Sequence, residues 1–346
     1  MSVADPITPV KGTGAAMARD VAPRPSRASA WKAALLDRAS LIIPCVMLAA
    51  LLGLYASLRD GVFTIDELNL DTAAAMTLLL AATGQTIVLL RGGIDLSIGG
   101  MISLGTVLAA TRFGTDPAQA TAWALGIVVL GALVGALNGV LITALRLQPF
   151  LVTLATWSIL SGTAMIILPT DGGSLPTGWT MFGVTSWLGL STSVWLLALL
   201  LVFWFWFKRT RLGIAIRATG SNERSAFLAG VSPIGINIAT YGLSGLFAAL
   251  AALYLTTQTG AGSPTIGKDY ILPSVAAAVI GGISLFGGRG GLVGTVIGAF
   301  ILTIIGNLVF VLEVSSYWQP IVSGIILLVA VLASSIAEKS ARRSLS

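Results

Sequence analysis

Residues 84–100 read GQTIVLLRGGIDLSIGG, and this stretch sets the interpretation of the whole chain. An apolar run ends at Arg91, two glycines follow, and a second apolar run starts beyond Asp95. Glycine permits a break or a tight reversal between two apolar helices where protein or water shields the backbone. A similar stretch, GGISLFGGRGG at residues 281–291, also separates two apolar runs. From Gly92 onward the first stretch, like the second, begins Gly-Gly-Ile and ends in paired glycines, which suggests an internal duplication.

The composition is that of a membrane protein. Of the 346 residues, 55% are hydrophobic and only 10% are charged, and the mean hydropathy is +0.93. Soluble domains carry about 25% charged residues, so this chain lacks the polar surface that a water-soluble globule needs. In lipid the backbone must satisfy its own hydrogen bonds, which favours helices. We therefore predict an all-α, polytopic membrane protein.

About ten apolar segments approach the roughly 20 residues that a transmembrane helix needs. Several contain Gly or Pro, and we expect some of these helices to be broken or re-entrant at glycine-rich turns. The predicted spans are 40–58, 70–90, 94–111, 120–145, 150–168, 192–207, 234–257, 271–286, 291–312 and 318–337. They form a transmembrane domain over residues 39–338, between a basic tail at 1–38, predicted to be disordered, and a short tail at 339–346.

The basic residues predict the orientation in the membrane. If the N-terminus is cytoplasmic and all ten spans exist, the cytoplasmic segments hold 17 of the 20 Lys and Arg residues and the outer segments hold three. Cytoplasmic loops carry an excess of Lys and Arg. The partition therefore predicts an even number of spans and two cytoplasmic termini. It also explains the net charge of +6 without a nucleic-acid partner.

The residues for catalysis and for metal binding are largely absent. With one Cys (Cys45) and no His, internal disulfides, His/Cys metal sites and His-based catalysis are excluded. Residues 262–269 have the Gly-x4-Gly-Lys spacing of a phosphate-binding loop, but Asp269 stands where a Mg-binding Ser or Thr belongs, and the segment maps outside the membrane. We therefore predict that the chain is not an enzyme, binds no cofactor and does not hydrolyse ATP itself.

The cytoplasmic loop at residues 208–232 contains a predicted helix of two turns. Ser221 is a suitable N-cap, Glu223 places an acid in the first turn, and Gly230 is a suitable stop. An isolated helix of this length is marginal in water. It either packs on a partner through apolar side chains such as Phe227 or is a surface turn with basic residues, and the loop alone does not choose.

Charged groups are scarce within the predicted spans, where Asp95 is the one plausible ion-coupling residue. We interpret Asp95 as a cap of the following helix, with proton transfer as the alternative. Neutral polar side chains suit the passage of an uncharged polyol, with hydrogen bonding between helices as the alternative. The candidate translocation residues are Gln85, Asn138, Thr153, Thr156, Gln258 and Asn307. The candidate hinge residues are Gly92, Gly93, Asp95, Gly99, Gly281, Gly282, Gly287 and Gly288.

The longest outer loop, about residues 169–191, carries the aromatic residues Trp179, Phe182 and Trp187. Aromatic side chains gather at the lipid headgroups of membrane proteins. A docking surface for an outer partner is the alternative, and the sequence does not choose between them.

Six motifs together resemble the ribose/xylose/arabinose type of ABC-importer permease. They are GQTIV at 84–88, GGIDLSIG at 92–99, NG at 138–139, PFLVTL at 149–154, ATGSNE at 218–223 and GGISLFGGRG at 281–290. The resemblance runs from about residue 40 to residue 337 and so covers nearly the whole chain outside the tails. Taken together the motifs are specific, whereas any one of them alone is not.

The resemblance implies a multi-pass permease of the bacterial inner membrane with a set of partners. These are a second copy or a paralogue of the permease, a periplasmic sugar-binding protein and a cytoplasmic ATPase that holds ATP and Mg. The substrate class is sugars and other small polyols, including autoinducer 2. The loop then becomes the coupling helix to the ATPase. Its coupling residues would be Arg217, Gly220, Ser221, Asn222, Glu223, Arg224, Phe227 and Gly230.

Three rival classes remain open. A branched-chain amino-acid permease of the ABC type shares the broken-helix style. An ion-coupled secondary transporter is disfavoured by the scarcity of charge within the spans. A non-transporting membrane sensor is disfavoured because the sequence carries no recognisable soluble signalling domain.

Overall fold

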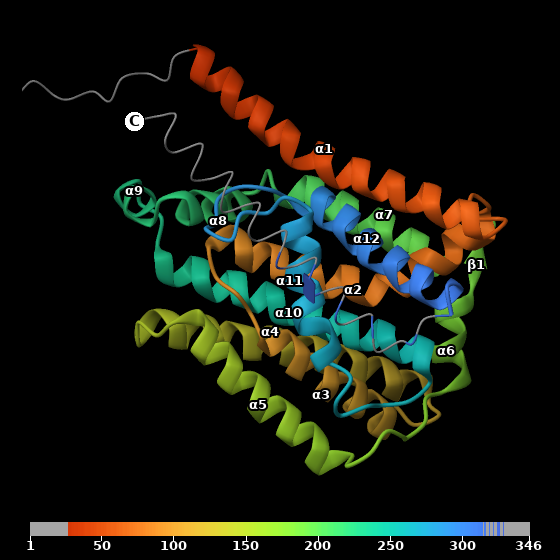
Figure 1. Ribbon diagram of the computed structural model, residues 1–346. Helices are drawn as coiled ribbons and strands as arrows, with labels where there is room; N and C mark the ends of the chain where they lie inside the picture. The colour runs from red at the N-terminus through yellow and green to blue at the C-terminus, as the bar shows by residue number, and fades with distance from the viewer. Residues whose placement is uncertain are drawn as a thin grey trace, which may run out of the picture.

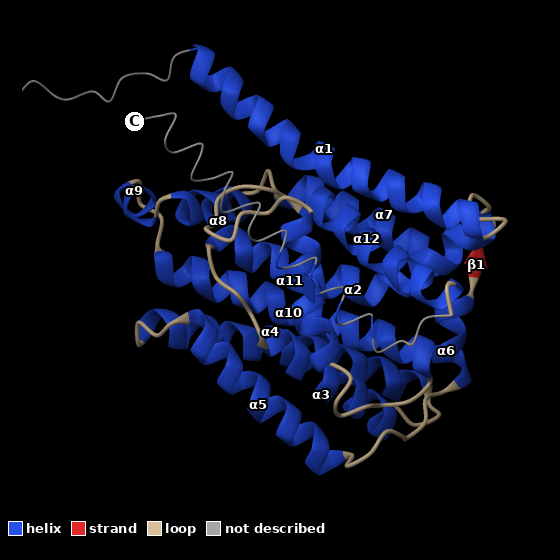
Figure 2. Ribbon diagram, in the orientation of Figure 1, coloured by secondary structure: helices blue, strands red, loops and turns tan. Residues whose placement is uncertain are grey.

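The computed structural model describes residues 27–313 and the isolated positions 315, 318, 321, 324, 325 and 328. This part of the chain is helical almost throughout, as predicted (Figures 1 and 2). The helices are α1 (Arg27–Leu58), α2 (Ile65–Arg91), α3 (Ser97–Arg112), α4 (Pro117–Ala144), α5 (Pro149–Ile167), α6 (Thr177–Val184), α7 (Thr192–Phe207), α8 (Arg211–Ser221), α9 (Glu223–Leu228), α10 (Pro233–Thr259), α11 (Lys268–Ile280) and α12 (Leu292–Val311). One small hairpin pairs β1 (Ser186–Trp187) with β2 (Leu190–Ser191).

The first nine predicted spans each overlap a helix, but fewer of these helices can cross a membrane alone. Six are long and apolar enough within the described residues, namely α1 from Leu41, α2, α4, α5, α10 and α12. The pair α7 and α8 meets at 73° and makes a seventh if it is one broken span. Since α3 has 16 residues and α11 has 13, both fall short of the roughly 20 that a span needs. The count of about ten is therefore not confirmed.

The predictions for the two ends of the chain fall mostly outside the described residues. Span 318–337 and the tail at 339–346 lie in this category, as does the predicted tail up to residue 26. Helix α1 begins at Arg27, inside the tail that we expected to be disordered, so it extends well beyond the predicted span 40–58.

Two helices of equal length, α2 and α10, form the centre of the bundle (Figure 1). The protein buries 89% of the most apolar window of α2 and 67% of that of α10. The corresponding figures are only 11% for α1 and 22% for α5. Helices α1 and α5 therefore present most of their apolar side chains outward, as helices in contact with lipid do.

Helix α4 packs on α10 through glycines at every fourth position. A Cβ atom at Gly135 would overlap the carbonyl oxygen of Tyr241, and one at Gly139 would lie 2.6 Å from that of Asn237. Gly131 completes the series one turn earlier. Small residues spaced by four let two backbones approach closely in a membrane. The abundance of glycine in the sequence thus serves helix packing as well as turns.

The first glycine-rich stretch forms a break between α2 and α3, as predicted. Gly92 has a φ of +90° and its N–H bonds the carbonyl of Leu89 at 2.9 Å, which ends α2. Glycine adopts this left-handed conformation without a steric penalty. The Asp95 carboxylate then accepts the backbone N–H of Ser97 at 2.9 Å. Asp95 thus accepts a free N–H of the first turn of α3, as predicted, although the N-cap position itself is Leu96.

The second glycine-rich stretch has a different structure. Residues 281–291 form a compact loop from α11 to α12, and four of its glycines, at 282, 287, 288 and 290, have φ between +75° and +102°. It leads into a full-length helix, whereas residues 92–96 lead into the short helix α3. The two stretches therefore differ in structure, and the duplication stays a prediction that this comparison does not support.

The aromatic residues of the outer loop divide into two groups. Trp179 donates its indole N–H to the hydroxyl of Thr256 at 3.0 Å and packs edge-on against Phe113, with ring centroids 4.8 Å apart. Phe182 is 50% exposed and Trp187 is 67% exposed. Trp179 thus supports the fold. Contact with lipid headgroups and contact with an outer partner remain the two alternatives for Phe182 and Trp187.

Candidate functional site

The predicted coupling loop folds as two helices, α8 and α9. The observed bounds of α9, Glu223–Leu228, lie between the predicted N-cap, Ser221, and the predicted stop, Gly230. Its N-cap is Asn222, whose side-chain oxygen accepts the N–H of Ser225 at 2.9 Å. The predicted N-cap Ser221 is wrong, because that residue closes α8 instead. Gly230, with a φ of +87°, ends the segment as predicted.

Helix α9 projects from one end of the molecule (Figure 1) and carries an uncovered apolar tip. Phe227 is 62% exposed and Leu228 is 78% exposed. Arg224 is exposed beside them. At the other end of α9, the Glu223 carboxylate pairs with the guanidinium of Arg91 at 3.0 Å. The tip of α9 thus combines two apolar side chains with a basic one. The first residue of α9 is anchored to α2 by the ion pair.

The base of this surface is a junction of three backbones, which we call the glycine junction: residues 90–92, 220–221 and 287–288. The N–H of Gly288 bonds the carbonyl of Leu90 at 2.9 Å. A Cβ atom at Gly220 would overlap that same carbonyl, and Gly287 lies against both Gly220 and Gly92. No Cβ atom fits at Gly220, Gly287 or Gly288. A displacement of α8 would therefore press on the end of α2 and on the loop between α11 and α12.

Not every predicted hinge or coupling residue takes part in the glycine junction. Gly93 lies against the Tyr241 hydroxyl, Gly99 against Gly267, and Gly281 against Gly294. Gly282 has a φ of +86° at the start of its loop. The guanidinium carbon of Arg217 lies 5.7 Å from the centroid of the Trp204 ring, which ties α8 to α7.

A buried polar network joins the break after α2 to α4 and α5. The hydroxyl of Ser97 donates to the Asp95 carboxylate at 2.5 Å and accepts from the amide of Asn138 at 3.0 Å. The Asn138 oxygen accepts from the Thr156 hydroxyl at 2.6 Å. Thr153 donates to the carbonyl of Pro149 at 3.0 Å and lies 3.4 Å from that of Ile94. Three candidate translocation residues, 138, 153 and 156, therefore come together.

The other three candidate translocation residues lie apart from this network. Gln85 is fully buried on α2, and its amide has no hydrogen-bond partner among the described residues. Gln258 is exposed at the far end of α10. Asn307 donates to the carboxylate of Asp71 at 2.7 Å. The six residues are therefore not gathered in one place, and Asn138, Thr156 and Asn307 make hydrogen bonds between helices. Their role in translocation stays a prediction.

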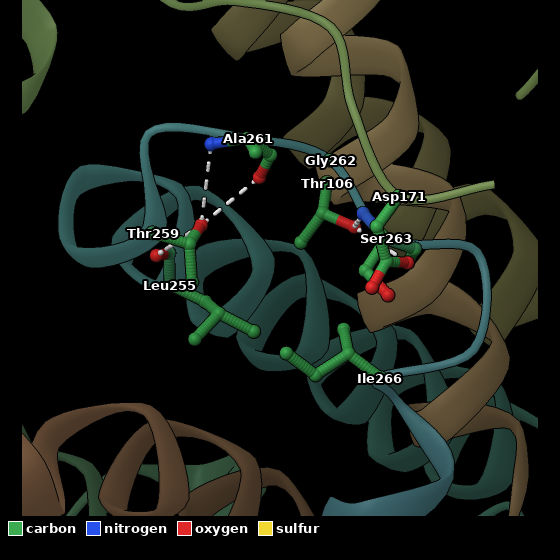
Figure 3. A pocket seen from close by; sticks show the side chains of 8 residues that line it. All are labelled: Thr106, Asp171, Leu255, Thr259, Ala261, Gly262, Ser263 and Ile266. Carbon is green, nitrogen blue, oxygen red and sulfur yellow. Dashed lines mark hydrogen bonds between the residues drawn. The ribbon is translucent and has the colours of Figure 1, made fainter.

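Sequence reasoning missed two polar cavities at the end of the bundle opposite α9. One, of about 110 Å³, is lined by Thr106, Asp171, Thr259 and Ser263 together with apolar residues (Figure 3). Its signal was present in residues 262–269, which we considered only as a phosphate-binding loop.

The second cavity, of about 240 Å³, lies among α1, α2 and α12. The Glu67 carboxylate there accepts from the Tyr55 hydroxyl at 2.7 Å and from Arg59 at 2.8 Å. Asp71 and Asn307 complete its polar lining. Its signal was the pair of acids one turn apart at the start of α2. No group of three or more metal-ligating side chains occurs in the described part of the chain.

Comparison with known proteins identifies the family. The profile described as "Branched-chain amino acid transport system / permease component" matches residues 72–331. The ribose import permease of Escherichia coli K12 is 37% identical over 309 residues, which cover 87% of this chain and 94% of that protein. No solved structure matches the chain.

Two further relatives extend the comparison. The D-allose transport system permease of Escherichia coli K12 is 32% identical, with 82% of this chain and 88% of that protein covered. The autoinducer 2 import system permease of Photorhabdus laumondii is 30% identical, with 84% and 88% covered. The resemblance drawn from the six motifs is confirmed. The chain therefore belongs to this family of transport-system permease components and is similar, along most of its length, to relatives named for ribose, allose and autoinducer 2.

Proposed function

We propose that this chain is the membrane-spanning subunit of an ATP-driven importer that carries a pentose or a similar small polyol into the cell. The similarity to permeases named for ribose, allose and autoinducer 2 supports this substrate class. The neutral amides and hydroxyls of the bundle suit such a ligand better than an ion. The description of the family favours branched-chain amino acids as the second candidate substrate class.

The exposed apolar tip of α9 is the observation that carries the proposed coupling to an ATPase. Phe227 and Leu228 would sit in a groove of a separate cytoplasmic subunit that holds ATP and Mg. Because the glycine junction has no room for side chains, movement of α9 would pass through α8 to the end of α2. From there it would reach the break that contains Asp95.

The remaining partners follow from the family and from the charge partition. A periplasmic binding protein would deliver the sugar at the end of the bundle opposite α9. A second copy of the chain, or a paralogue, would complete the transporter in a bacterial inner membrane. Both termini and the loop at 208–232 would face the cytoplasm, in keeping with the 17 basic residues assigned to that side.

Uptake by the reconstituted complex tests this function. Proteoliposomes that hold the chain with its ATPase and binding protein should accumulate labelled ribose only when ATP is supplied. Labelled leucine in place of ribose tests the second substrate class. Uptake of ribose by the chain alone, or uptake abolished by a protonophore and indifferent to ATP, would rule out the proposal.

A charge at the tip of α9 tests the coupling. Phe227→Asp should reduce both ATPase binding and ribose uptake at least about tenfold, because a carboxylate in an apolar interface loses its hydration. Leu188→Asp is the matched control for ATPase binding alone, since Leu188 is 94% exposed at the tip of the hairpin at the opposite end of the molecule. Equal effects of the two substitutions on ATPase binding would contradict a coupling role for α9.

A further inference from the structure

Two segments of the chain have similar sequences and lie between similar pairs of helices. Residues 92–99 read GGIDLSIG and residues 260–267 read GAGSPTIG, with Gly first, a hydroxyl residue sixth and Ile-Gly last. Each follows a helix of 27 residues, α2 or α10. The first includes the start of the short helix α3 at Ser97, and the second ends just before the short helix α11 begins at Lys268. The first glycine is left-handed in both, with φ of +90° at Gly92 and +64° at Gly260. We call residues 92–99 the first break and residues 260–267 the second break.

The two halves that contain these breaks run in opposite directions. Gly84 of α2 packs on Ser244 of α10, whereas the Tyr254 hydroxyl reaches the carbonyl of Ala73 at 3.4 Å, so the two helices are antiparallel.

The last glycines of the two breaks, Gly99 and Gly267, pack directly against each other. Contact between equivalent residues places them on an axis that relates the two halves. In transporters built from inverted repeats, substrates bind near broken helices at the repeat interface.

The second break borders an accessible cavity (Figure 3). The Thr106 hydroxyl accepts the N–H of Ser263 at 3.3 Å and lies 3.1 Å from the carbonyl oxygen of the same residue, so a side chain of α3 pairs with the backbone of the break. Asp171 and Thr259 add a carboxylate and a further hydroxyl to the lining. The cavity of about 110 Å³ has room for several water molecules, since one needs about 10–15 Å³ on this measure. Hydroxyl groups of a polyol can replace those waters.

Polar side chains at the first break, and on α10 beside it, are buried without hydrogen-bond partners in the described part of the chain. Asp95 is 1% exposed, and its Oδ2 has no hydrogen-bond partner among the described residues. The Ser244 hydroxyl lies beside this carboxylate but outside hydrogen-bonding geometry. The Tyr241 hydroxyl, against Gly93, also lacks a partner in the described part of the chain. Buried polar atoms are nearly always paired in proteins. These three side chains therefore have unused hydrogen-bonding capacity.

We propose that the two breaks are alternately exposed halves of one polyol-binding path. The second break receives sugar hydroxyls in its cavity in the conformation described here. The first break, its counterpart under the inverted repeat, offers Asp95, Ser244 and Tyr241 to those hydroxyls once the bundle reorients. This inference rests on the proposed function, because it assumes a polyol substrate.

Cysteine accessibility in the complete transporter tests the alternation. The lone Cys45 is changed to Ser, and Ser263→Cys or Ser244→Cys is introduced. A polar thiol reagent should modify residue 263 at rest, and ribose-loaded binding protein should slow that reaction. Residue 244 should resist at rest and react when ATP and vanadate trap the cycle. Modification of residue 244 that is the same in both states would overturn the proposal, as would reaction at residue 263 that sugar and nucleotide leave unchanged.

A hydroxyl deletion tests sugar contact independently of labelling. Thr259→Val should raise the KM for ribose uptake about three- to tenfold while ATPase activity is retained, as expected for the loss of one hydrogen bond. Thr111→Val is the matched control, because Thr111 bonds the carbonyl of Val107 in its own helix at 2.7 Å and lies outside the cavity. Equal KM values for the two variants would contradict the site.

The unmodified complex separates this inference from the proposed function. If it imports neither ribose nor another small polyol, the proposed function fails. If it imports ribose while the labelling patterns stay constant, only the alternating breaks fail.

Discussion

At the scale of single residues, the cap of α3 explains why a carboxylate is tolerated in an apolar bundle. Asp95 accepts both the N–H and the hydroxyl of Ser97, at 2.9 and 2.5 Å. That hydroxyl in turn accepts from Asn138. One side chain thus orders the break, α3 and α4 together. These bonds use only Oδ1 of the carboxylate, and removal of either partner would leave buried polar groups unpaired.

Substitution of Asp95 separates its hydrogen bonds from its charge. Asp95→Ala should lower the free energy of unfolding by about 1–3 kcal/mol, because it leaves the N–H of Ser97 buried and unpaired. Asp95→Asn keeps an acceptor oxygen and should retain most of the stability. Thermal unfolding of the purified chain in detergent measures both. If Asp95→Asn is as unstable as Asp95→Ala, charge rather than capping holds the break.

The cap of α9 shows where residue-level reasoning stops. Ser221 and Asn222 are adjacent, and both are good N-caps. The choice falls on Asn222 because Ser221 packs against Gly288 and ends α8 at the glycine junction. That contact joins residues far apart in the sequence, so local preference could not have revealed it.

At the scale of helices, the glycine junction is where α8 meets α2. Gly220→Ala places a methyl group onto the Leu90 carbonyl, and overpacking of this kind costs about 1–3 kcal/mol. We expect a lower unfolding temperature and weaker stimulation of ATPase activity by the binding protein. Gly235→Ala on α10 is the control, since no atom lies within 4 Å of its Cβ position. That substitution should be neutral or stabilising by up to about 1 kcal/mol. A Gly220→Ala variant with normal stability and coupling would show that the junction tolerates movement.

At the scale of the whole molecule, the hydropathy of the sequence predicted the positions of the helices well. It predicted less well how many of them can cross a membrane. Lipid requires long apolar helices, and α2, α4, α5, α10 and α12 match their predicted ranges to within a few residues, apart from an extra turn at the start of α2. The second break was missed because Ser, Thr, Pro and Gly at 260–267 have the composition of an outer loop. Its polar backbone is paired with Thr106 and Ser103 of α3, a shielding that no local pattern reveals.

Orientation is the property of the whole molecule on which the proposed coupling depends. In a Cys45→Ser background, a single cysteine at Leu188 should react with an impermeant thiol reagent on intact spheroplasts. One at Ser225, exposed on α9, should react only in inverted vesicles. The reason is the excess of Lys and Arg on the side assigned to the cytoplasm, since basic loops are retained there. Labelling of residue 225 from outside would place α9 beyond the reach of any cytoplasmic ATPase, and the apolar tip formed by Phe227 and Leu228 would then need a different partner.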